Sequence, residues 1–241
     1  ARAGERAGDP SAVFQAVDRL AGVTKSPQAR AAWLVRAAET GEPTSGVSER
    51  ADALLRAFVL LPDPVTLDKL ARAIDRQLTL LPQEADLVVL RFGRAARAAL
   101  SKGEGPDAAR VAVRLASLAV DLAQDLALAW DCVERAFSCD GDIDEYRSLS
   151  RVAPQLAEAE GGRAAFGRAV ALSEQPYSSL GAAAFAFLGR VASAYGEGPT
   201  ARKLLVTSAV RDSDDDESVV LADEAIAALP DAADEKRFVR A

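Results

Sequence analysis

Residues 121–146, DLAQDLALAWDCVERAFSCDGDIDEY, contain the strongest structural pattern in this chain. The aromatic residues Trp130 and Phe137 are seven positions apart and lie on or beside one apolar stripe. This spacing predicts a helix over 125–139, because residues three or four apart share one face of a helix. Gly141 follows the stripe, where a left-handed helix cap favours glycine, so we expect the helix to end there.

A second stretch repeats this pattern 38 residues earlier. The aligned positions are Phe92 with Trp130, Ala95 with Val133, Ala96 with Glu134, Ala99 with Phe137 and Gly103 with Gly141. An offset of this size is typical of helix-pair repeats, which stack because one pair cannot bury its own apolar face.

Apolar residues continue at helical spacing on both sides of these stretches, whereas the alternation typical of strands is nearly absent. Ser26-Pro27 and Asp63-Pro64 precede stripes, and such pairs favour a helix start. We predict an all-α chain, an α-solenoid of about 12–13 antiparallel helices joined by short loops. The expected helices lie near 11–22, 27–40, 47–61, 65–81, 84–101, 107–122, 125–139, 143–158, 162–174, 178–195, 199–211 and 216–229, with a last one from 231.

The chain has no Gly/Ser-rich linker and no break in composition. We therefore expect a single α-helical repeat domain over 9–241, preceded by a frayed segment over 1–8. The sequence begins with Ala and contains no Met, which is compatible with a fragment of a longer polypeptide.

The absence of His removes several kinds of catalytic and metal site. Ser-His-Asp catalysis, His-ligated zinc and haem ligation by His all require an imidazole. The sequence also contains no Gly-rich phosphate loop, no CxxC and no HExxH. We expect no cofactor, no metal site and no enzymatic activity. A carboxylate pair could still perform acid–base chemistry, so an enzyme built on an α/α toroid is kept as a minor alternative.

The net negative charge of the chain limits the kinds of partner that it can bind. A net charge of −7 and a pI of about 4.9 argue against nucleic acid and against an anionic membrane surface. The longest uncharged stretch, 175–189, is shorter than the roughly 18–20 residues of a membrane helix, so no membrane insertion is expected.

Cys132 and Cys139 would lie roughly 10 Å apart along one helix, too far for a disulfide. Reduced thiols suit a cytoplasmic protein.

The stretch 121–146 resembles a tetratricopeptide repeat. That family has a large aromatic residue early in its first helix, small residues in the middle, a further aromatic residue, and then Gly-Asp before the second helix. The matching positions are Trp130, Phe137, Gly141 and Asp142. Glu134 replaces the small residue that the family has, and Tyr146 replaces its Ala, so the repeat is degenerate. Residues 187–205 and 34–64 carry weaker echoes. Between 143 and 178 the helices do not fit simple pairs, which leaves HEAT-like or irregular α-solenoid packing open.

The resemblance implies a protein–protein interaction scaffold or adaptor. In tetratricopeptide arrays the first helices of the pairs line a concave groove that receives an extended peptide or a partner helix. By that rule, the inward-facing positions are Asp131, Arg135 and Ser138 in one repeat and Gly93, Arg97 and Leu100 in the other.

Arg91, Arg94 and Arg97 follow one another at three-residue spacing on one predicted helix. They could form a cationic strip for acidic side chains of a partner, since guanidinium groups bind carboxylates in a bidentate way. The alternative is a solvated helix face whose charges pair with nearby Asp and Glu. Together with the implied positions, the candidate partner-binding residues are Arg91, Arg94, Arg97, Asp131, Arg135 and Ser138.

Two acidic segments allow other interpretations. Asp140, Asp142 and Asp144 alternate as in a calcium loop, but Glu145 and Arg151 stand where an EF-hand needs Gly and Glu. An acidic helix start explains these residues better. The run over 212–217 is interpreted as a solvated turn.

A second hypothesis for the whole chain is self-association, as a structural module of a larger bacterial machine.

Overall fold

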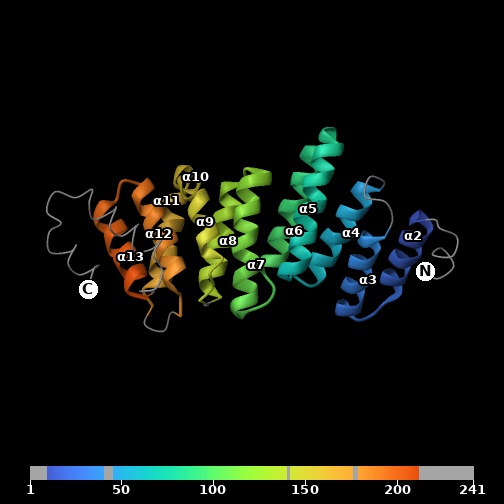
Figure 1. Ribbon diagram of the computed structural model, residues 1–241, viewed down its shortest axis with the longest axis horizontal. Coiled ribbons are helices and arrows are strands. Elements are labelled where there is room, and N and C mark those ends of the chain that lie inside the picture. The colour runs from blue at the N-terminus through green and yellow to red at the C-terminus, as the bar shows by residue number, and fades with distance from the viewer. Residues whose placement is uncertain (1–9, 41–45, 140–141, 176–178, 212–241) are drawn as a thin grey trace. The chain divides into compact units, whose positions relative to one another are not determined.

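The computed structural model describes residues 10–40, 46–139, 142–175 and 179–211. Within these ranges the chain is all-α, without a strand, and inside each of two compact units the helices pack in consecutive antiparallel pairs (Figure 1). The predicted all-α class is therefore confirmed, while the α-solenoid arrangement stays a prediction that the paired packing fits. The helices expected over 216–229 and from 231, the acidic run over 212–217 and the segment 1–8 lie outside the described residues.

The helices group into two compact units, which divide between Gly103 and Glu104. The first unit contains α2 (Pro10–Val23), α3 (Pro27–Glu39), α4 (Val47–Leu60), α5 (Pro64–Leu80), the 3-10 turn η1 (Pro82–Glu84) and α6 (Ala85–Leu100). The second contains α7 (Gly105–Leu118), the π-helical turn η2 (Ala119–Ala123), α8 (Leu126–Ser138), α9 (Tyr146–Leu149), the 3-10 turn η3 (Ser150–Val152), α10 (Ala153–Glu158), α11 (Gly162–Ser173), α12 (Ala182–Ala194) and α13 (Gly198–Arg211). The prediction of one domain over 9–241 stays a prediction.

Two of the helix starts expected from proline pairs are confirmed by side-chain caps. The side chain of Ser26 accepts a hydrogen bond from the backbone N–H of Ala29, at the start of α3. Asp63 Oδ1 accepts one from the N–H of Thr66 at 2.9 Å, at the start of α5. Each cap satisfies an N–H group that has no partner within its own helix.

The continuous helix predicted over 143–158 is wrong. The structure instead has two short helices, α9 and α10, with the 3-10 turn η3 between them. Pro154 lies in the first turn of α10. Proline has no N–H to donate to the preceding turn, and its ring crowds the carbonyl there, so an unbroken helix is disfavoured at this point.

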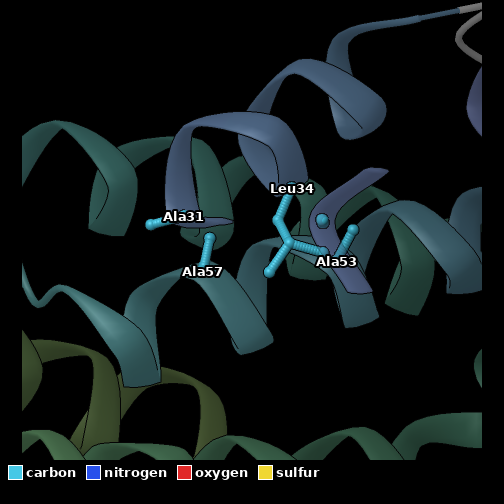
Figure 2. Close-up of a cluster of buried hydrophobic side chains, with 5 residues drawn as sticks. Ala31, Leu34, Ala53 and Ala57 are labelled. Atoms are coloured by element: carbon cyan, nitrogen blue, oxygen red, sulfur yellow. The ribbon is translucent and has the colours of Figure 1, made fainter. Parts of the chain in front are cut away.

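One core cluster of the first unit, between α2, α3 and α4, is built largely from alanine. Figure 2 shows Ala31 and Leu34 of α3 directed toward Ala53 and Ala57 of α4. With Ala21 of α2, these side chains are at most 5% exposed. Because alanine adds little volume, the three helices approach closely and need few aromatic residues to fill the space between them.

In the second unit the core is richer in aromatic side chains. The rings of Phe137 and Tyr146 meet edge to face with their centroids 5.2 Å apart. The helix α12 is buried along nearly its whole length and packs against α13. Cys132 and Cys139 are both buried and form no disulfide, and burial raises the pKa of the Cys139 thiol.

Candidate functional site

The first unit contains an open groove of about 480 Å³ between α3, α4 and α6. Its lining residues are Arg30, Asp52, Leu55, Arg56, Val59, Leu60, Arg91, Arg94 and Ala95. They come from three different helices, and all of them belong to the same compact unit. This groove is therefore formed by packing within the unit.

The floor of the groove is apolar. Leu55 and Ala95 are buried, and Val59 and Leu60 are partly exposed. Leu55 and Val59 are four residues apart on α4, so they share one helix face. On the neighbouring helix α6, the small side chain of Ala95 adds little bulk, which leaves the floor open to a ligand. A floor of this kind can cover apolar side chains of a bound segment.

The rim of the groove is strongly cationic. Four guanidinium groups face a single carboxylate, that of Asp52. Asp52 lies between two of them, with its oxygens 3.9 Å from Arg56 Nη1 and 3.9 Å from Arg91 Nη1. Arg56 Nη1 is also 2.8 Å from Asp18 Oδ1 of α2. These contacts fix two of the arginines while leaving the groove with excess positive charge.

The other two arginines of the groove have their charges available. Neither Arg30 nor Arg94 forms an ion pair with the residues that the structure describes. The Nε of Arg30 is buried without a hydrogen-bond partner there. A buried donor left in this state costs free energy.

The exposed face of α6 extends the groove toward the start of that helix. Leu87 and Leu90 are 46% and 51% exposed, large fractions for leucine side chains. Each lies four residues before an arginine of the rim, Arg91 or Arg94, so the leucines and arginines share one helix face. This face combines apolar contact area with positive charge.

Only two of the six residues expected to bind a partner line this groove, namely Arg91 and Arg94. Arg97 is exposed one turn further along α6 and is not among the lining residues. The neighbouring position Gly93, expected to face a partner, is buried in the packing of α6, and Leu100 is partly exposed at the end of the helix.

The other three predicted residues lie on α8 in the second unit. Asp131 and Ser138 are exposed and Arg135 is partly exposed. Arg135 Nη1 donates to Ser138 Oγ at 3.4 Å, and Ser138 Oγ donates back to the carbonyl oxygen of Arg135 at 2.7 Å. These local bonds occupy part of the hydrogen-bonding capacity that a partner would use.

A neighbouring ion pair further neutralises this part of α8. Arg168 of α11 donates from Nε and Nη2 to the carboxylate of Glu134. The hydrogen bond with Glu134, followed by its charge, raises the pKa of Arg168, and Asp131 contributes less. The α8 positions are thus less free to bind a charged partner than the arginines of the groove.

Sequence reasoning missed the groove residues contributed by α3 and α4. Arg30, Arg56 and Leu55 belong to helices that were predicted correctly, but only packing places them beside α6. The spacing of Asp52 and Arg56, four residues apart, was the available signal for a charged face on α4.

The acidic residues Asp142 and Asp144 follow α8 in sequence. Asp142 lies against Gly181, where an added Cβ would overlap its carboxylate, 1.5 Å from Oδ1. Glycine therefore makes room for this side chain just before α12.

Among the described residues there is no group of three His, Cys, Asp or Glu side chains arranged to hold a metal ion. No helix among them has the length and apolar character needed to cross a membrane.

Comparison with known protein families and with curated proteins gave no match. The class of the protein is therefore defined by its structure, an all-α chain of helices packed in consecutive antiparallel pairs.

Proposed function

We propose that this chain is a tetratricopeptide-like α-solenoid scaffold that binds an acidic, partly apolar segment of another protein. The segment lies in the groove between α3, α4 and α6 of the first unit. The observation that carries the proposal is a local excess of positive charge over an apolar floor, in a chain whose net charge is −7. A non-enzymatic role and a cytoplasmic location belong to the same proposal.

The chemistry of the groove defines the segment that it would select. Carboxylates of the segment would pair with Arg30 and Arg94, whose guanidinium groups lack an ion-pair partner among the described residues. Leucine-sized side chains would cover the floor near Leu55 and Val59. Apolar contact supplies affinity here, while charge sets the orientation of the segment and excludes basic competitors.

A selection from a random peptide-display library against the full chain tests this proposal. We expect the selected peptides to combine Asp or Glu with Leu, Ile or Phe. The double variant Arg30→Glu/Arg94→Glu should lose them. Arg19→Glu, an exposed arginine of α2 that does not line the groove, should retain them. Peptides without acidic residues, or equal selection by the two variants, would contradict the proposal.

A further inference from the structure

A second groove of the first unit lies between α3, α4 and α5 and has a volume of about 330 Å³. Its lining residues are Ala38, Glu39, Val47, Arg50, Leu54, Lys69, Arg72, Ala73 and Arg76. On α4 it uses Val47, Arg50 and Leu54, whereas the first groove uses Asp52, Leu55, Arg56, Val59 and Leu60 of the same helix. The two grooves therefore use different faces of α4.

Four cationic side chains meet one carboxylate in this second groove. That carboxylate is already engaged, since Lys69 Nζ lies 2.6 Å from Glu39 Oε1. The guanidinium groups of Arg50, Arg72 and Arg76 are left without an acidic partner among the lining residues. Such an accumulation of like charge is unfavourable unless an anion compensates it.

Two of these arginines are held in place by backbone oxygens. Arg50 Nη2 donates to the carbonyl oxygen of Thr40 at 2.8 Å, and Arg72 Nε donates to that of Asp68 at 3.2 Å. Each bond uses one donor and leaves the rest of the guanidinium for a ligand. Arg76 forms no hydrogen bond or ion pair with the described residues. Burial, and after it the charge of Arg76, lowers the pKa of Arg50.

We propose that Arg50, Arg72 and Arg76 form a binding site for a small anion of the diphosphate class. The volume suits a ligand of a few non-hydrogen atoms more than a long peptide, and three forked donors match the oxygens of two linked phosphoryl groups. This proposal is independent of the peptide groove, because it uses none of the residues that line it.

Titration calorimetry with inorganic pyrophosphate tests the site on the full chain, at an ionic strength held constant with NaCl. We expect saturable binding to one site. Arg76→Gln should weaken it by about tenfold, the loss expected for one charge-assisted contact. Arg50→Gln should have at least this effect. Because Arg76 is exposed and forms no hydrogen bond or ion pair with the described residues, its variant reports on binding even if Arg50→Gln destabilises the unit.

Matched variants locate the site. Arg19→Gln, outside both grooves, and Arg94→Glu, in the peptide groove, should bind pyrophosphate as the wild type does. A second titration with ADP separates two sources of the anion. Equal affinity for ADP and pyrophosphate would show that the site recognises the diphosphate alone, and tighter ADP binding that it also contacts the nucleoside. The proposal would be overturned if the heat of binding disappeared at matched ionic strength. It would also be overturned if Arg94→Glu bound pyrophosphate more weakly while Arg76→Gln bound it as the wild type does.

Discussion

The indole Nε1 of Trp130 in α8 donates a hydrogen bond of 2.9 Å to the backbone carbonyl oxygen of Leu156 in α10. Gly162, at the start of α11, packs against the same pair. A Cβ added to it would lie 2.8 Å from the Leu156 oxygen and 3.0 Å from the indole nitrogen. The aromatic residue that defines the sequence repeat thus connects three helices of the second unit through one buried polar contact.

Replacing Trp130 by Phe should lower the free energy of unfolding by at least about 1–3 kcal/mol, because the carbonyl of Leu156 would lose its buried donor. Urea denaturation followed by circular dichroism measures this change. Tyr195→Phe is the matched control, since the Tyr195 hydroxyl is buried near Gly162 without a hydrogen-bond partner among the described residues. Removing that hydroxyl should be neutral or stabilising, and a larger loss than in Trp130→Phe would contradict this account.

Two glycines in helices of the second unit should respond to alanine in opposite directions. A Cβ on Gly189 of α12 would lie 2.6 Å from Leu205 Cγ of α13, so Gly189→Ala should destabilise the unit by about 1–3 kcal/mol. A Cβ on Gly167 of α11 would meet nothing within 4 Å, so Gly167→Ala should stabilise it by about 0.5–1 kcal/mol. Thermal unfolding measures both, and equal signs would refute the close packing of α12 on α13.

The carboxylate of Glu84 should make the stability of the first unit depend on pH in the acidic range. Its Oε2 accepts hydrogen bonds from Ser48 Oγ at 2.8 Å and from Gln77 Nε2 at 2.7 Å. These bonds, the one from Ser48 first, hold the pKa of Glu84 below its ordinary value of 4.5. A carboxyl whose pKa falls on folding stabilises the folded state above its unfolded pKa, and this contribution is lost as pH falls through the folded pKa.

Urea unfolding of the wild type and of Glu84→Gln, compared between about pH 6 and pH 3, tests this expectation. The advantage of the wild type should be constant above pH 4.5 and should shrink below it. Ser48→Ala removes one of the two donors and should give an intermediate pH dependence. Parallel curves for wild type and Glu84→Gln would show that the hydrogen bonds do not favour the charged carboxyl.

Charge reversal should affect peptide binding differently at Arg94 and Arg97, although the sequence pattern predicts both as partner-binding residues. Arg94→Glu should weaken a selected acidic peptide by about tenfold or more, because Arg94 lines the groove. Arg97→Glu, one turn further along α6, should change the affinity by less than about threefold. Fluorescence anisotropy with a labelled peptide measures both, and added salt should weaken the wild-type complex. An equal or greater loss of affinity in Arg97→Glu would show that the binding surface extends beyond the residues that line the groove.

Charge reversal on α8 tests the remaining predicted positions separately. Asp131→Lys and Arg135→Glu lie in the second unit, away from the groove residues in sequence. If the groove alone holds the peptide, both variants should bind it with unchanged affinity in the same anisotropy measurement. A clear loss in either variant would instead support the α8 positions that the repeat resemblance implies.

Much of the secondary structure followed from local signals. The predicted helices over 27–40 and 47–61 agree with α3 and α4 to within one residue, because caps and apolar spacing act over only a few residues. The break within 143–158 was missed although Pro154 signals it. The apolar spacing continues across the break, with Tyr146, Leu149 and Leu156 all buried, and this masked it.

The sequence by itself determined the all-α class, most of the helix boundaries and the arginines of α6 as candidates, since each depends on residues close together in the chain. Only the tertiary structure decided which charges share a groove. Arg30, Arg56 and Arg94 are far apart in sequence, and packing of α3, α4 and α6 brings them around one apolar floor. Packing also separates Arg94 from Arg97, because the place along α6 at which it packs against its neighbours decides which of its turns borders the groove.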